Sequence, residues 1–212
     1  MILSDINFYF ASWQQNVRQH ALSILTDAFL DKHGSSLPAE TVCRVLPSIC
    51  IPLAGKRITV LLLDESRMLS HTEEIMIEFE QCTSLIFKPL LHHLNNILKS
   101  QADLLSVWRS LLKVMEPLLS EPVPESYEEG GREMSPEKLS LTLKELATEH
   151  LRNAIMVLHS HCMLAGNPLP DDEISTLTWE AVSKMAFCNN MMEEWKQQAA
   201  VPPADPCFPT TS

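Results

Sequence analysis

Apolar side chains recur every three or four residues along most of the chain, which is the spacing of one buried face of an α-helix. The first such stripe predicts a long amphipathic helix over residues 5–32, ended by the Gly34-Ser35-Ser36 run. Its apolar members are Phe10, Trp13, Val17, Ala21, Ile24 and Ala28.

Residues 38–63 are harder to interpret because two prolines interrupt the apolar run. Pro47 and Pro52 lie within residues 42–53, so a helix there is expected to be short or kinked. The β-branched residues of 58–63 could form a buried strand, but no strand partner is evident. We therefore predict a helix over 58–63.

Four further helices are predicted, over 73–99, 101–120, 136–165 and 172–198. Ser70 and Glu73 have the spacing of a capping box, and Pro89 predicts a bend in the helix that follows. Ser135-Pro136 is a typical start for the third of these helices. The helix over 101–120 is apolar on two sides, so it is expected to lie between neighbours with Trp108 buried.

The pattern indicates an all-α fold of antiparallel helix pairs. Pairs of about 40 residues are typical of HEAT and armadillo solenoids, and an irregular helical bundle is the alternative. The apolar period is lost over 120–135, which predicts a flexible acidic loop, and over 201–212, which predicts a disordered tail. We expect one helical domain over 1–200.

Charge and composition exclude several function classes. The 212 residues include 27 acidic and 16 basic side chains, for a net charge of −11, which disfavours nucleic acid and a polybasic grip on anionic membranes. The few adjacent basic pairs, such as Lys56-Arg57, make no patch. Five glycines cannot supply a dinucleotide or P-loop motif. No signal peptide or transmembrane segment is evident, so we expect a cytoplasmic protein with its six cysteines reduced.

Candidate chemistry is sparse. His159, His161 and Cys162 form the densest group of possible zinc ligands, but residues 159 and 161 point about 200° apart on a helix. No cysteine lies in a glycine-bounded turn that would expose a nucleophile. We therefore expect no catalytic residue, cofactor or metal.

A contact surface for a partner is predicted near the end of the last helix. Trp195 lies among charged neighbours and is the tryptophan best placed to be partly exposed. With Met191 and Met192 it could form a soft apolar patch.

Part of the chain resembles a known family. Residues 151–158, LRNAIMVL, followed by Gly166 and by the Leu177-Thr178-Trp179-Glu180 run, resemble the C-terminal helical region of the large Arf guanine-nucleotide exchange factors of the Golgi brefeldin-A-resistance group. Phe79 and the Trp108 helix are similar to the preceding helices of that family, so the resemblance spans residues 75–185. The family's usual second tryptophan before the Thr-Trp pair is replaced here, and its following proline is missing.

The resemblance implies a regulatory role without catalysis, because no segment matches the exchange domain. Its implied place is the cytoplasmic side of Golgi membranes, in Arf-dependent vesicle traffic, with protein partners and contact with the membrane surface. The alternative is a HEAT-like interaction scaffold unrelated to Arf, and an enzyme using a metal or a thiol is a third class.

Overall fold

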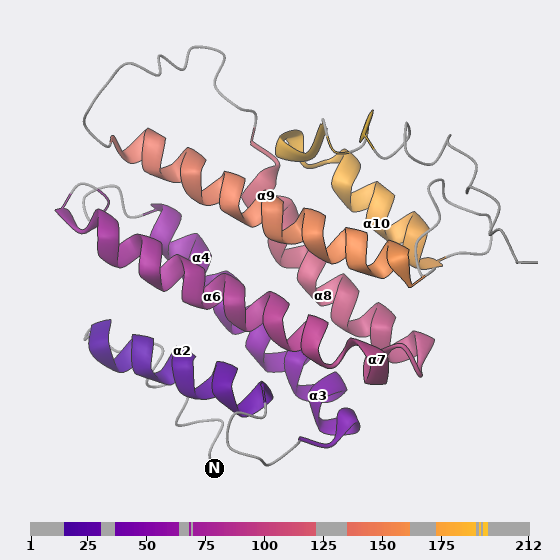
Figure 1. Ribbon diagram of the computed structural model, residues 1–212. Coiled ribbons are helices and arrows are strands. Elements are labelled where there is room, and N and C mark those ends of the chain that lie inside the picture. Colours follow the sequence, from indigo (N-terminus) through magenta and orange to yellow (C-terminus); the bar gives the residue numbers. More distant parts are fainter. Residues whose placement is uncertain are drawn as a thin grey trace, which may run out of the picture.

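The computed structural model describes residues 15–30, 37–63, 68, 70–121, 135–161, 173–189, 191 and 193–194. Within these ranges every regular element is a helix, so the predicted all-α fold is confirmed (Figure 1). The elements are α2 (Gln15–Phe29), α3 (Ala39–Val45), η1 (Leu46–Cys50), α4 (Ile51–Leu63), α6 (Thr72–His92), α7 (Leu94–Ile97), α8 (Gln101–Leu119), α9 (Pro136–Ser160), α10 (Glu173–Ser183) and η2 (Ala186–Cys188).

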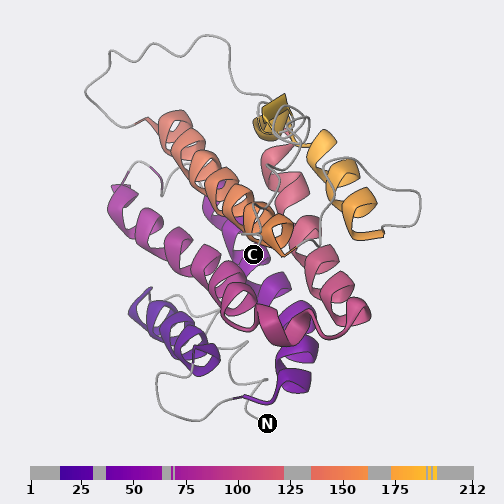
Figure 2. The ribbon, with the colours of Figure 1, turned by 45° about the vertical axis from the view of Figure 1, so that its right-hand side comes forward.

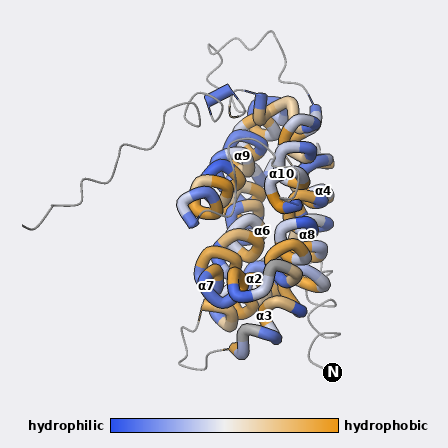
Figure 3. Tube along the Cα trace, turned by 90° about the vertical axis from the view of Figure 1, so that its right-hand side faces the viewer, coloured by the Kyte–Doolittle hydropathy of each residue, from blue (hydrophilic) through white to orange (hydrophobic). Residues whose placement is uncertain are grey.

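The helices form two layers. Helix α6 packs between α2 and α9 in one layer, and α8 packs between α4 and α10 in the other. Contacts of α4 with α6 and of α8 with α9 join the layers, which Figure 3 shows from the side. Each pair of successive long helices contributes one helix to each layer, and these helices pack mainly on helices of other pairs, α6 on α9 and α8 on α10. The arrangement is consistent with the predicted helical solenoid or bundle.

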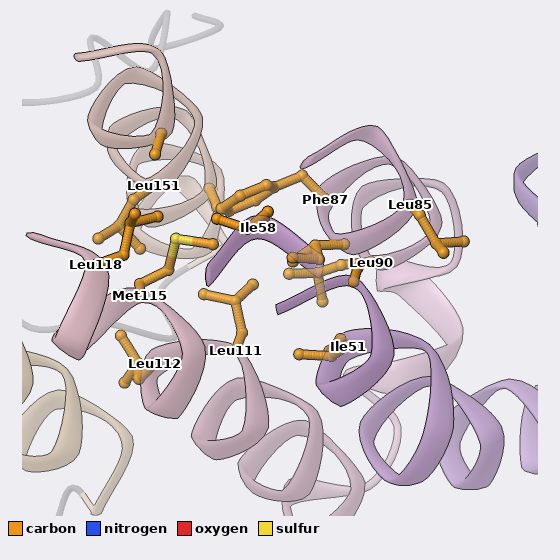
Figure 4. Close-up of a cluster of buried hydrophobic side chains, with 14 of the residues drawn as sticks. Ile51, Ile58, Leu85, Phe87, Leu90, Leu111, Leu112, Met115, Leu118 and Leu151 are labelled. Carbon is orange, nitrogen blue, oxygen red and sulfur yellow. The ribbon is translucent and has the colours of Figure 1, made fainter. Parts of the chain in front are cut away.

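The core lies between the layers and is built by the predicted apolar stripes. Leucine, isoleucine and phenylalanine side chains of α4, α6, α8 and α9 meet there (Figure 4). Trp108 is fully buried, as predicted. Helix α8 buries residues toward α4 and also toward α9 and α10, which confirms its position between neighbours.

The chain from Ala39 to Leu63 is one continuous helical path that contains a π-helical turn at η1. The Ile51 N–H donates to the Leu46 carbonyl, five residues back, and Pro52 has no N–H to donate. The Pro47 carbonyl instead accepts a hydrogen bond from Ser110 Oγ on α8, at 2.8 Å. The prolines thus produce a π turn rather than a break, and the helix predicted over 58–63 is confirmed.

One predicted detail of α6 is wrong, because His71 is the N-cap of α6 and Ser70 is not the capping residue. The helix includes Pro89, near which a bend is predicted, and it ends at His92. The chain turns at His93 before the short α7. The His93 side chain is fixed there because its Nε2 lies 2.6 Å from the Phe29 carbonyl oxygen at the end of α2.

The other helix boundaries follow their capping residues. Ser100 Oγ accepts the Asp103 N–H at the start of α8, and Ser135 Oγ accepts the Lys138 N–H at the start of α9, as the Ser135-Pro136 run predicts. The predicted acidic loop falls between α8 and α9, and residues 122–134 of it lie outside the described residues. So do residues 5–14 of the first predicted helix and the tail over 201–212.

Candidate protein-interaction surface

The predicted contact patch is not supported by the position of its first member. Met191 is 1% exposed and belongs to the core, because the chain after α10 folds back through η2 onto α9. Met192 and Trp195 lie outside the described residues. The predicted helix over 172–198 is also divided, since α10 ends at Ser183 and η2 follows.

A groove of about 930 Å³ lies instead between α8 and the continuous helical path formed by α3, η1 and α4. Figure 2 shows α8 running between this path and α10. The path contributes Cys43, Arg44, Pro47, Ser48, Pro52, Gly55, Lys56 and Thr59. Helix α8 contributes Ala102, Leu105, Ser106, Arg109, Ser110, Lys113, Val114 and Pro117.

The π turn aligns one wall of this groove. In an uninterrupted α-helix, Arg44 and Lys56 are twelve residues apart and would point about 120° away from each other. One extra residue in the π turn removes about 100° of that rotation, which leaves the two side chains about 20° apart on one face. Both therefore line the same groove.

Close approach of the two walls depends on Gly55. A Cβ atom at this position would lie 2.6 Å from both γ-carbons of Val114 on α8. Real carbon contacts are much longer, so only glycine lets α4 and α8 meet here. Gly55 and Val114, which meet at this contact, both line the groove.

Four charged side chains line the groove, and all of them are basic. They are Arg44, Lys56, Arg109 and Lys113. Arg109 Nη2 lies 2.9 Å from Glu173 Oε1, but both side chains are 59% exposed, so this ion pair is weak. No acidic side chain in the described part of the chain lies within ion-pair distance of Arg44, Lys56 or Lys113.

This basic lining corrects the prediction that the chain has no basic patch. Lys56 and Arg57 are adjacent in sequence, yet Lys56 faces the groove and Arg57 faces the interior. The other three basic residues come from distant positions on α3 and α8. The sequence signal that could have revealed part of this lining is the polar stripe of α8, on which Arg109 and Lys113 are one helical turn apart. The same stripe also carries the acidic Glu116, which faces the α10 side.

A second, smaller groove of about 430 Å³ lies on the other side of the exposed ridge of α8, against α10. Arg109, Lys113 and Pro117 line both grooves. The smaller groove is lined by acidic as well as basic side chains, and Lys184 Nζ lies 3.5 Å from Glu116 Oε1. The basic character is therefore confined to the larger groove.

The residues that carry the family resemblance are brought together by a buried hydrogen bond. Trp108 Nε1 donates to Thr178 Oγ1 at 2.7 Å, and the Thr178 hydroxyl donates to the Ile174 carbonyl at 2.7 Å. The Thr-Trp helix, α10, is thus fixed against the tryptophan of α8, and α8 is held in place as a groove wall.

On the other side, α4 is held by a buried ion-pair network. Glu78 on α6 is fully buried and accepts from Arg18 Nε on α2 at 2.9 Å and from Arg57 Nε on α4 at 2.5 Å. Burial raises the pKa of the Glu78 carboxyl, but the hydrogen bonds and charges of the two arginines outweigh it and hold that pKa below its usual value. Arg57 Nη2 has no hydrogen-bond partner among the described residues.

The four cysteines that the structure describes lack the properties of nucleophiles. Cys43, Cys50, Cys82 and Cys188 are buried free thiols. Burial raises the pKa of the Cys50 thiol to about 12 and that of Cys188 to about 11, so both stay protonated at neutral pH. The other two thiols have raised pKa values for the same main reason.

The candidate zinc ligands do not converge within the described part of the chain. His161 Nδ1 lies 2.9 Å from the Val157 carbonyl oxygen at the end of α9, and the His150 ring stacks on Phe87 with ring centres 5.4 Å apart. Cys162 lies outside the described residues. No group of three or more histidine, cysteine or acidic side chains among those described could hold a metal ion.

One described helix, Glu40–Leu63, has the length and mean hydropathy, 1.5, of a membrane-spanning helix. This is weak support for a span, because core helices of soluble proteins have the same properties. Ile51, Ile58 and Leu61 of this stretch pack in the core, while Arg44 and Lys56 line the groove.

The sequence matches a known family over residues 3–187, which is most of the chain. The matching family is described as the GBF1-like tetratrico peptide repeat region. No curated protein and no solved structure matches the chain. The match favours the predicted exchange-factor relationship over an unrelated HEAT-like scaffold. The chain therefore belongs to the GBF1-like tetratrico peptide repeat family, as its resemblance to the C-terminal helical region of a large Arf guanine-nucleotide exchange factor predicts.

Proposed function

We propose that this chain is a non-catalytic regulatory region that places a GBF1-like exchange factor on Golgi membranes by binding a protein partner. The observation that carries this proposal is the groove beside α8. It is hollowed between two helices of one layer, and both walls are fixed by buried contacts of Glu78 and Trp108. A rigid, partly apolar groove of this kind is suited to binding a segment of another protein.

The membership of a helical repeat family supports the same function. Helical repeats act mainly by presenting an extended surface to protein partners. The chain's net charge of −11 opposes direct electrostatic attraction to anionic lipids, so recruitment through a protein is the favoured route. The placement at the Golgi follows from the family resemblance and is part of the proposal.

Localisation of the tagged 212-residue chain in cells tests the proposal. The wild type is expected to be enriched at the Golgi, and Ser106→Trp, which fills the groove from α8, is expected to abolish the enrichment. Ser106 is exposed and lines the groove, so this change does not disturb the core. Asn153→Trp on the exposed face of α9 is the matched control and is expected to localise like the wild type.

Circular dichroism of both variants establishes that they remain folded. A diffuse wild-type chain, or a folded Ser106→Trp chain that still reaches the Golgi, would contradict the proposal. The purified chain is also expected not to accelerate nucleotide release from Arf, and measurable exchange would place catalysis in this region.

A further inference from the structure

We propose that the groove beside α8 binds an acidic peptide segment of a partner protein in an extended conformation. This inference rests on the proposed function, because it names the chemistry of the partner that the groove would bind. Its basis is that four basic side chains line one groove together with prolines, Gly55 and aliphatic side chains.

The charge of the groove is opposite to that of the protein as a whole. The chain has 27 acidic and 16 basic residues, yet the charged side chains that line the groove are Arg44, Lys56, Arg109 and Lys113. The Asp103 carboxylate, hydrogen-bonded to the lining Cys43, offsets only part of this charge. Like charges gathered at one site destabilise the free protein slightly and favour a ligand of opposite charge. Carboxylates of a bound segment would provide that charge.

The overall acidity limits which anions can reach the groove. A nucleic acid or an anionic bilayer presents a large charged surface, and a protein of net charge −11 repels it. A short acidic segment interacts only with the groove itself, because charges farther than about 10 Å are screened at ordinary salt concentration. The charge distribution therefore favours a peptide over the larger polyanions.

The spacing of the basic residues fits a short extended segment. Arg44 and Lys56 are twelve residues apart on a nearly continuous helix, which separates them by about 18 Å along its axis. On the opposite wall, Arg109 and Lys113 are separated by one helical turn, about 6 Å. An extended chain advances about 3.3 Å per residue, so five or six residues span the groove between Arg44 and Lys56.

The uncharged lining can bind the backbone and the remaining side chains of such a segment. Ser48, Ser110 and Thr59 each donate their hydroxyl hydrogen to a backbone carbonyl of this protein, which leaves their oxygen lone pairs able to accept N–H groups of a peptide. Pro52, Val114 and Pro117 offer apolar contacts. Side chains that alternate between acidic and apolar would therefore satisfy both the basic and the apolar lining.

Fluorescence anisotropy of a labelled seven-residue peptide that alternates glutamate with leucine tests the inference on the full chain. Saturable binding with one site per chain is expected, weakening as salt rises from 50 to 300 mM. The same peptide with glutamine in place of glutamate is expected to bind at least about tenfold more weakly, since each screened charge pair contributes up to about 1 kcal/mol.

The matched variants change two lysines to glutamine. Lys56→Gln with Lys113→Gln removes two groove charges and is expected to weaken binding about fivefold to tenfold. Lys88→Gln with Lys99→Gln removes two exposed charges from outside the groove and is expected to leave binding unchanged. Equal binding by the two double variants, or by the glutamate and glutamine peptides, would overturn the inference.

The two experiments together distinguish a failure of this inference from a failure of the proposed function. Loss of Golgi enrichment in Ser106→Trp without any binding of the acidic peptide would leave the function standing and contradict the inference. Binding of the wild type to phosphatidylserine vesicles, lost in the groove double variant and unaccompanied by peptide binding, would show that the groove takes a lipid surface instead.

Discussion

The helices of the N-terminal half and those of the C-terminal half are fixed to their neighbours by different kinds of buried interaction. In the N-terminal half, α2, α4 and α6 meet at the buried charges of Arg18, Arg57 and Glu78. In the C-terminal half, α8 and α10 meet at the neutral hydrogen bond between Trp108 and Thr178, and their ion pairs lie on the surface.

This difference predicts how much stability each half loses when one of its contacts is removed. Removing one member of a buried charge network leaves the others without compensation in a medium of low polarity, which strongly destabilises the fold. Removing one partner of a neutral buried hydrogen bond leaves only a dipole unpaired, and breaking an exposed ion pair has a small effect. Helix α2 therefore depends on charge, whereas α10 depends on packing and shape.

The largest expected effect comes from removing the side chain of Trp108. Trp108→Ala should lower the free energy of unfolding by about 3–5 kcal/mol, through lost apolar burial and the cavity that remains. Urea denaturation of the full chain measures the change. Trp108→Phe, which keeps most of the ring, is the control and should be clearly less destabilising; a Trp108→Ala loss below about 1 kcal/mol would show that the C-terminal half does not depend on this side chain.

The next largest effect is expected at Glu78 in the N-terminal half. Glu78→Gln should lower the free energy of unfolding at pH 7 by about 3 kcal/mol, because Arg18 and Arg57 remain buried without their carboxylate. Glu74→Gln, at a partly exposed position on the same helix, is the matched control and should change it by less than about 0.5 kcal/mol. Equal stabilities of the two variants would contradict the importance of the buried network.

The same network should make the N-terminal half sensitive to acid. The pKa of Glu78 in the folded protein lies below its ordinary value of 4.5, so its contribution to stability is complete above pH 4.5 and is lost as the pH falls through the folded-state pKa. The stability difference between the wild type and Glu78→Gln should therefore narrow below pH 4.5. A difference that stays constant between pH 7 and pH 3 would be inconsistent with this origin.

A smaller effect is expected from the neutral hydrogen bond itself. Thr178→Val keeps the shape of the side chain but leaves the Trp108 N–H without its acceptor, which should cost about 1–2 kcal/mol. In a double-mutant cycle with Trp108→Phe, the two losses should not add, because both changes remove the same bond. Additive losses would mean that this bond does not couple α8 to α10.

The smallest effect is expected at the surface ion pair between α8 and α10. Arg109→Gln should change the free energy of unfolding by less than about 0.5 kcal/mol, because both partners are well exposed. Guanidinium chloride denaturation is unsuitable here because it screens the pair, so urea at low salt is the measurement. A loss above about 1.5 kcal/mol would show that the C-terminal half is also held by charge.

The all-α class, the succession of long helices and the burial of Trp108 can be read from the sequence alone. These follow from local rules, since apolar residues spaced three or four apart define a helix face, and Ser135-Pro136 defines a helix start. The relationship to exchange factors also came from short local stretches around residues 151–158 and Thr178-Trp179. Each of these signals lies within a few turns of one helix.

The groove that we propose as the partner site is evident only in the tertiary structure. In the folded chain Met191 is buried, the adjacent Lys56 and Arg57 face the groove and the buried Glu78 respectively, and Arg44, Lys56, Arg109 and Lys113 line one groove. The π turn that aligns one wall depends on Pro52, whose missing N–H is evident in the sequence, and on Ser110, which lies 63 residues from the Pro47 carbonyl that it satisfies. Periodicity specifies one helix at a time, whereas a groove depends on the distance and rotation between two helices, which are set by the packing of both.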